Sequence, residues 1–257
     1  MVDNPIVYIK QLYNLKIEYF SFDVSSWFFY KKEMYRIKRR GIVKNLKKIE
    51  KLVNYIKLAW DRKLTESTGG NMSVRIGEEI YITPTYFVKH FLTVDDISII
   101  NFKGEKIKNK KVKFSSEYKM HLRLYKERKD IKSIFHAHPR YALILAICKE
   151  KLNIRYFPES IESLSSITYI PYHMPGTDEF ADSFIEGARK GSNVFILKNH
   201  GVTVCGSSIE AAFATLENLE TCCFAWVTMK LMKEKPSLIS EKDAKILLQS
   251  IEGSQNY

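Results

Sequence analysis

Three histidines and one glutamate have types and spacings that could hold a metal ion. His136 and His138 are two residues apart in a predicted strand, so both side chains leave the same face. Such a pair can place two imidazole nitrogens on one metal at about 2.0–2.1 Å. His200 lies in a turn before Gly201, where a loop can bring in a third nitrogen, and Glu117 begins the helix ahead of the strand. Three neutral imidazoles and a displaceable group would leave an open coordination position, which is typical of catalytic zinc.

The spacing alone leaves other interpretations open. A His-x-His pair also occurs on exposed surfaces with no ligand role. The ligand types do not separate zinc from manganese, iron or cobalt. The other histidines (His90, His121 and His173) show no partner pattern, and we expect them to be surface or core residues.

Small polar residues gather in three further stretches that could bind a phosphate group. The loop 68–71 (TGGN) offers backbone N–H groups, an amide and two glycines that allow close approach of an anion. Residues 83–85 (TPT) add hydroxyls at the end of a predicted strand. Residues 115–116 (SS) add two more at a helix N-terminus, where the dipole favours phosphate. Each stretch alone could be an ordinary turn or cap, but three of them beside a candidate metal site favour an anionic substrate.

Alternating helices and strands are expected to position these residues. Apolar residues between 45 and 60 fall on one helical face. We predict strands at 73–76, 80–83, 133–138 and 167–172 and two strands within 193–205, and helices starting at 115 or 116, after Pro139, at 178–190 and at 207–233. This alternation predicts an α/β fold with a mixed central sheet.

The composition excludes a globally disordered chain and suits one large domain with an appendage. The chain has 257 residues, of which 45% are apolar and 13% aromatic. Residues 1–42 are crowded with aromatic side chains and end in a basic run. We therefore expect an N-terminal extension of open role at 1–42, a domain at 43–235 and a C-terminal tail at 236–257.

Charge is the unusual property of the composition. The 41 basic and 29 acidic residues give a net charge of +12, which favours anionic partners. The sequence has no helix-turn-helix, zinc-finger or RNA-recognition pattern, so we expect a lysine-rich surface and no nucleic-acid partner. No stretch approaches the roughly 18 apolar residues of a membrane span, so no membrane partner is expected. Four cysteines without a C-x-x-C pair or a signal peptide predict reduced thiols in a cytoplasmic protein.

Five motifs occur in the order and approximate spacing of the class II aldolase/adducin family. They are GGNMSVR at 69–75, ITPT at 82–85, SSE at 115–117, HAHP at 136–139 and NHG at 199–201. From about residue 43 to 235 the chain resembles the zinc-dependent fuculose-phosphate aldolases of that family. The resemblance implies a three-layer α/β/α sandwich with a mixed, largely antiparallel sheet. It also implies a homotetramer with sites between subunits.

The same resemblance implies a set of site residues. Zinc would be held by the three histidines and Glu117, and Glu117 would also act as the acid/base. The phosphate pocket would consist of Gly70, Asn71, Thr85, Ser115 and Ser116.

The activity implied is cleavage of a ketose 1-phosphate, of the fuculose or deoxyribulose type, to dihydroxyacetone phosphate and an aldehyde. A divalent metal can stabilise the enediolate as a Lewis acid while Glu117 moves the proton. A sugar-phosphate dehydratase or decarboxylase of the same family stays open. Glu117 argues against an epimerase, which carries aspartate there. The complete ligand set argues against a non-catalytic module like the adducin head.

Two places depart from the aldolase pattern. Tyr86 stands where the aldolases carry a glycine after the ITPT motif, which predicts a narrower or differently shaped phosphate loop. A family tyrosine that protonates the departing aldehyde falls near Phe157. Tyr156 is therefore a candidate second acid/base, and Glu159 is another.

Overall fold

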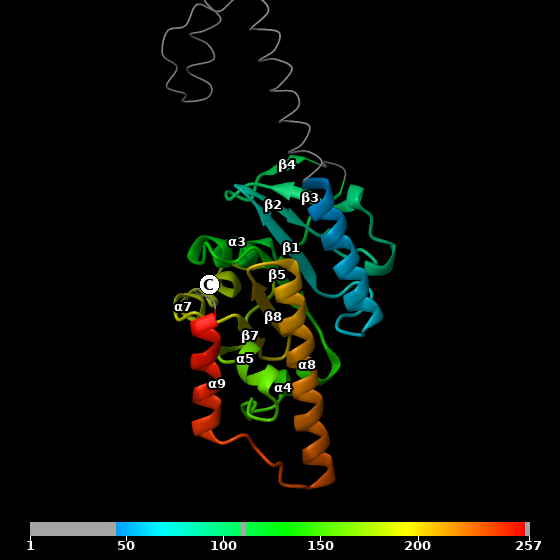
Figure 1. Cartoon of the computed structure of the whole chain (residues 1–257). Coiled ribbons are helices and arrows are strands. Elements are labelled where there is room, and N and C mark those ends of the chain that lie inside the picture. The colour runs from blue at the N-terminus through cyan, green and yellow to red at the C-terminus, as the bar shows by residue number, and fades with distance from the viewer. Residues whose placement is uncertain (1–44, 109–111, 255–257) are drawn as a thin grey trace, which may run out of the picture. The chain divides into compact units, whose positions relative to one another are not determined.

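The computed structural model describes residues 45–108 and 112–254, and these form eight strands in one central sheet (Figure 1). In chain order the strands are β1 (Asn71–Ile76), β2 (Glu79–Ile82), β3 (Ser98–Ile100), β4 (Lys106–Lys108), β5 (Ser133–Ala137), β6 (Ile167–Ile170), β7 (Val194–Leu197) and β8 (Gly201–Gly206). Their order across the sheet is β4-β3-β2-β1-β5-β8-β7-β6, and β6 and β7 are the one parallel pair among these strands. The predicted α/β class with a mixed, largely antiparallel sheet is confirmed. The extension expected at 1–42 lies outside the described residues.

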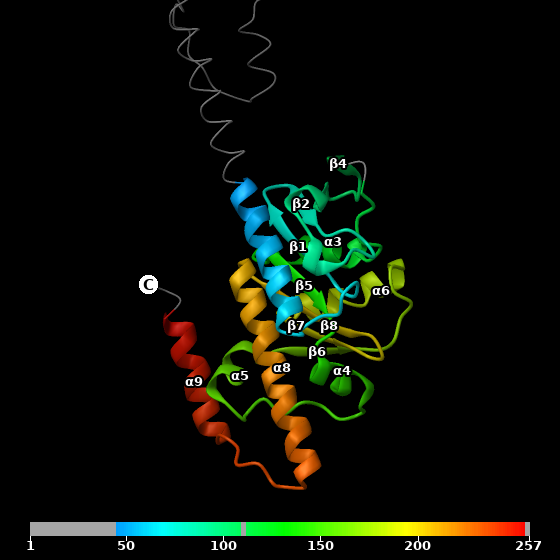
Figure 2. The same ribbon diagram turned by 90° about the vertical axis from the view of Figure 1, so that its right-hand side faces the viewer.

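Helices cover both faces of this sheet, which makes three layers. A helix at residues 45–61, α4 (Arg140–Ile147), α5 (Pro158–Ser163) and α8 (Ile209–Met232) lie on one face. On the other face lie α3 (Tyr118–Glu127), α6 (Asp178–Asp182) and α7 (Ile185–Arg189). Figure 2 shows the 45–61 helix beside α8, and ion pairs of Lys51 with Glu210 and of Arg62 with Glu217 join the two. Within the described residues no helix is long and apolar enough to cross a membrane.

The alternation of side chains along the strands explains the two layers. Met72 and Phe135 pack in the core under α8, whereas their strand neighbour Ile134 packs in the core under α3. His136 is two residues after Ile134 and therefore points to the α3 side. Asn71 pairs with His136 across β1 and β5, so its side chain lies on the same face.

Several elements differ from the sequence-based expectation. The helix predicted at 178–190 is divided into α6 and α7, because the Phe184 N–H bonds the Ala181 carbonyl three residues back and tightens the chain into a turn. The short strands β3 and β4, with three residues each, offer too little periodicity to be predicted. Two 3-10 turns, η1 (Lys89–Phe91) and η2 (Val94–Asp96), precede β3, and α9 (Glu241–Ser254) forms within the expected tail.

Candidate active site

The end of β5 and the turn between β7 and β8 bring the three candidate histidines together. His136 is fully buried on β5, and its Nε2 lies 3.3 Å from the Nε2 of His138, which follows the strand. His200 sits in the β7–β8 turn, where Asn199 adopts a left-handed φ of 56°. The ring centroid of His200 is 4.7 Å from that of His136 and 5.6 Å from that of His138. One ligand nitrogen from each ring lies within 4.8 Å of the others.

Glu117 completes this cluster from the start of α3. One carboxylate oxygen, Oε2, is 3.4 Å from His136 Nε2, and the other, Oε1, is 3.4 Å from His200 Nε2. Glu117 is the residue before the first turn of α3, so the helix carries it to the face of the sheet that holds His136. The four side chains predicted to form a metal site are thus neighbours, although they come from three separate stretches of sequence.

Burial controls the charge of these groups. Burial, reinforced by the neighbouring His138 and His200, lowers the pKa of His136 well below its usual value. Burial and then His138 lower the pKa of His200 to about 4. Burial also raises the pKa of Glu117 to about 7, against the amide of Asn71, which lowers it. Both histidines are therefore neutral near pH 7 and offer lone pairs.

The arrangement of lone pairs fits a bound cation. His136 Nδ1 donates to the Val202 carbonyl at 3.0 Å, and His138 Nδ1 donates to the Glu66 carboxylate at 2.6 Å. The N–H of the neutral His136 ring is on Nδ1, so His136 Nε2 carries a lone pair, and this atom lies 3.3 Å from Nε2 of His138. Glu117 Oε1 is buried and has no hydrogen-bond partner among the described residues. Acceptors that face one another in this way suit a divalent first-row metal bound by nitrogen and oxygen.

Glu66 is a site residue that the sequence analysis missed. Its carboxylate fixes the tautomer of His138, an arrangement that commonly orients metal-ligating histidines. The same ring requires glycine at position 201, because a Cβ there would lie 2.5 Å from His138 Cδ2. A carboxylate in the loop just before the Gly69-Gly70 pair was the available signal for Glu66, but its partner is 72 residues away.

The residues proposed for phosphate binding lie in different environments. Gly70 has φ of +67°, and a Cβ there would lie 2.5 Å from the His136 carbonyl, so it allows β1 to approach β5. The Asn71 side chain is buried and donates to Glu117 Oε2 at 2.5 Å. The backbone N–H groups of Thr85 and Ser115 bond the carbonyls of Lys113 and Thr83. Ser115 is buried, and its Oγ accepts from the Glu117 N–H at 3.3 Å. Ser116 is exposed. The amide of Asn71 is thus engaged with the carboxylate rather than directed to a separate anion site.

Three further residues singled out in the sequence contact other parts of the chain than the histidine cluster. They are Tyr86, Tyr156 and Glu159. Tyr86 has φ of 53° and is 86% exposed, so it keeps a left-handed conformation that favours glycine. The Tyr156 ring lies tilted beside that of Phe157 and packs against the core under α8, and burial raises the pKa of Tyr156. Glu159 is exposed in the first turn of α5. The structure does not bring Tyr156 or Glu159 into a described contact with the histidines, and their role stays a prediction.

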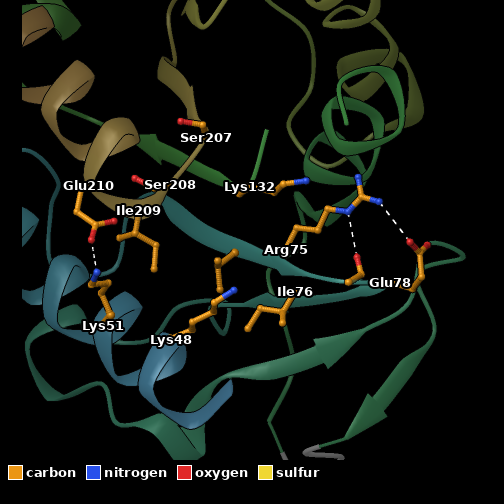
Figure 3. Close-up of a pocket in the computed structure, with 12 residues that line it drawn as sticks. Lys48, Lys51, Arg75, Ile76, Glu78, Lys132, Ser207, Ser208, Ile209 and Glu210 are labelled. Atoms are coloured by element: carbon orange, nitrogen blue, oxygen red, sulfur yellow. Dashed lines mark hydrogen bonds and ion pairs between the residues drawn. The ribbon is translucent and has the colours of Figure 1, made fainter. Parts of the chain in front are cut away.

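A hollow of about 560 Å³ lies at the opposite ends of β1 and β8 from the histidines (Figure 3). Helix 45–61, the end of β1 and the start of α8 line it. Two ion pairs line it, Lys51 with Glu210 and Arg75 with Glu78, and Lys48 and Lys132 add two further positive charges. These pairs join the 45–61 helix to α8 and close the β1–β2 turn.

Comparison with known proteins agrees with this geometry. The family model "Class II Aldolase and Adducin N-terminal domain" matches residues 50–227. The chain belongs to this family. An L-fuculose phosphate aldolase from Methanococcus maripaludis (strain C7) is 36% identical over 172 residues, which cover 66% of this chain and 92% of the relative. A 5-deoxy-D-ribulose 1-phosphate aldolase from Bacillus thuringiensis serovar kurstaki is 31% identical over 209 residues, 80% of this chain and 96% of the relative.

Two further members of the family extend the comparison. A 3-oxo-tetronate 4-phosphate decarboxylase from Haemophilus influenzae is 29% identical over 180 residues, 68% of this chain and 84% of the relative. A solved structure of an L-fuculose 1-phosphate aldolase matches with a TM-score of 0.73 and 26% identity. The match covers 80% of this chain and 96% of the aldolase chain. Relatives named for different reactions therefore each match two thirds or more of this class II aldolase-family chain.

Proposed function

We propose that the protein is a divalent-metal-dependent aldolase that cleaves a ketose 1-phosphate to dihydroxyacetone phosphate and an aldehyde. The observation that carries this proposal is the convergence of three imidazole rings and the Glu117 carboxylate at the end of β5. Relatives named for two sugar-phosphate aldolases support the reaction class.

In this proposal His136, His138 and His200 hold the metal, with zinc as the first candidate. When bound, the cation supplies Lewis acidity for the negative charge that develops on the substrate when the carbon–carbon bond breaks. Glu117 accepts or returns the proton, because a carboxyl group with a pKa of about 7 exchanges protons near neutral pH. Glu66 keeps the His138 ring in the orientation that presents Nε2 to the cluster.

The substrate phosphate is the second element of the proposal. The Ser115, Ser116 and Thr85 hydroxyls and the backbone at Gly70 are the groups proposed to bind it. A phosphate held there gives binding energy remote from the reacting bond, which orients the ketose for cleavage. Asn71 acts in this scheme through its amide on Glu117.

Metal analysis and a coupled assay for dihydroxyacetone phosphate test the proposal on one purified sample. About one metal ion per chain and chelator-sensitive aldehyde release from fuculose, ribulose or 5-deoxyribulose 1-phosphate would support it. Bound metal with no aldehyde release would favour a same-family dehydratase or decarboxylase. A protein that binds no metal when zinc is supplied would favour an adducin-like binding module.

A variant pair tests the role of Glu117. Glu117→Gln should keep the metal on the three histidines and lower turnover by at least about 10²-fold, as expected for a lost acid/base group. Glu159→Gln is the comparison variant and should retain turnover, because Glu159 is exposed on α5. If Glu159→Gln loses turnover and Glu117→Gln retains it, Glu159 is the acid/base. If Tyr156→Phe is the variant that loses turnover, Tyr156 has that role.

The homotetramer enters the proposal from the family resemblance. Sedimentation velocity of the full chain measures the assembly, and a species of four chains is expected. A monomer with full activity would contradict sites built between subunits.

A further inference from the structure

A buried chain of polar side chains continues beyond Glu117 into the space between α3 and β1. Asn71 Nδ2 is 2.5 Å from Glu117 Oε2, and Asn71 Oδ1 is 2.5 Å from His121 Nε2. His121 Nδ1 is 2.7 Å from Ser73 Oγ, which is 2.8 Å from the Tyr125 hydroxyl. Ser73, His121 and Tyr125 are fully buried, and Asn71 is 4% exposed. Five polar residues are thus joined in one row that ends on the candidate acid/base.

The secondary structure places these residues opposite one another. Glu117, His121 and Tyr125 are spaced four residues apart and therefore share one face of α3. Asn71 and Ser73 are two residues apart and share one face of β1. The polar face of the helix meets the polar face of the strand, so contacts alternate between the two elements.

The hydrogens in this row have one consistent direction when Glu117 is ionised. A carboxylate only accepts, so Asn71 must turn its NH₂ group to Glu117 and its carbonyl to His121. His121 must then carry its proton on Nε2, since a carbonyl also only accepts. His121 Nδ1 therefore accepts from the Ser73 hydroxyl, and Ser73 accepts from Tyr125. Burial lowers the pKa of His121 to about 3, which keeps the ring neutral.

We propose that His121 is a positioning residue, which holds the Asn71 amide with its NH₂ group on Glu117 and so fixes the carboxylate between His136 and His200. An amide can rotate by half a turn and present its carbonyl instead, which would repel an ionised carboxylate. The Nε2–H of His121 prevents this rotation because it bonds only the oxygen of the amide. This inference rests on the proposed function, in which Glu117 handles the proton.

A core histidine without this role would be explained by packing alone, and two near-isosteric variants separate the alternatives. In His121→Gln the side-chain NH₂ takes the place of Nε2–H and can still donate to Asn71. In His121→Asn the shorter amide reaches Ser73 but leaves the Asn71 carbonyl without its donor. If His121 only packs, the loss of turnover in each variant should follow its loss of stability. If His121 positions Asn71, His121→Gln should keep its turnover while His121→Asn loses it.

Nitrogen NMR of the metal-free protein, with histidine labelled by ¹⁵N, tests the hydrogen direction without any substrate. The His121 ring signals are identified by their absence from the His121→Gln spectrum. At pH 8 we expect a neutral ring protonated at Nε2 and bare at Nδ1, the tautomer in which Nε2 donates to Asn71 and Nδ1 accepts from Ser73. A ring protonated at Nδ1 at that pH would overturn the inference, because Asn71 would then present its carbonyl to Glu117.

Turnover of the metal-loaded variants is the second measurement, with thermal unfolding recorded for each. His121→Asn should lower kcat by about 10- to 100-fold with little change in KM, and His121→Gln should stay within about threefold of the wild type. Equal kcat losses in both variants would overturn the inference. If no ketose phosphate releases an aldehyde, the proposed function fails, and the NMR result alone decides the positioning role.

Discussion

Replacing Gly201 with alanine should weaken metal binding, because the new methyl group meets the ring of a proposed ligand. Its Cβ would lie 2.5 Å from His138 Cδ2 and 2.8 Å from the Ala137 carbonyl oxygen. Ordinary contact begins near 3.4 Å, so the ring must retreat by about 0.9 Å (3.4 minus 2.5) if the backbone stays in place. Metal–ligand distances are held within about 0.2 Å, so this displacement removes His138 from a common ligand position. We expect metal affinity to fall by about 10- to 100-fold.

A matched variant separates this effect from general damage to the fold. A Cβ on Gly187, in α7, would lie 2.5 Å from Thr168 Oγ1 and 2.8 Å from Phe195 Cε1. Gly187→Ala therefore introduces a clash of equal size in the core, and we expect it to cost about 1–3 kcal/mol of stability with metal affinity unchanged. Competition titration against a chromophoric chelator and denaturant unfolding measure both quantities. Wild-type affinity in Gly201→Ala, or equal losses of affinity in the two variants, would refute the reasoning.

Three further perturbations address the surroundings of the cluster. Glu66→Gln should weaken metal binding by about 10-fold or more, because His138 loses its carboxylate partner. The free energy of unfolding should change by less than about 0.5 kcal/mol, because the Glu66 side chain is 55% exposed. Chelator competition and denaturant melts measure the two effects. In the metal-free protein burial raises the pKa of Glu117 from the ordinary 4.5 to about 7. As the pH rises from about 4.5 to 7, the wild type should therefore lose up to about 3 kcal/mol of stability relative to Glu117→Gln. A stability difference between the two that stays constant across this range contradicts the burial of the carboxyl group. Tyr86→Gly should raise the unfolding free energy by about 0.5–1 kcal/mol, since relief of the left-handed strain exceeds the entropy cost of glycine, and a lower denaturation midpoint would contradict this.

The parts of the site that were predictable from the sequence depend on local geometry. His136 and His138 share a strand, so a period of two residues was enough to place them on one face. The NHG turn placed His200 at the end of a strand, and its approach to the pair follows from the antiparallel pairing of β5 with β8. Family motifs then added Glu117, which the helix brings to the same face.

The contacts that were missed join residues that are distant in sequence. Glu66 lies 72 residues from its partner His138, and Asn71, which was expected to bind phosphate, lies 46 residues from its partner Glu117. His121 had no recognisable partner in the sequence, because its contacts with Asn71 and Ser73 form only when β1 is placed against α3.

If the proposed function holds, Tyr86 is the position at which we expect substrate preference to be set. Relatives named as aldolases and as a decarboxylase each match two thirds or more of this chain, so family membership alone does not determine the reaction. In this chain the histidines and Glu117 keep the family motif, whereas Tyr86 departs from the aldolase pattern in the loop proposed to hold phosphate. A strained, exposed aromatic residue brings no core packing in return for its strain. We therefore expect substitutions at Tyr86 to change the preference among ketose phosphates while metal content stays constant, and substitutions around Glu117 to change turnover for every substrate alike.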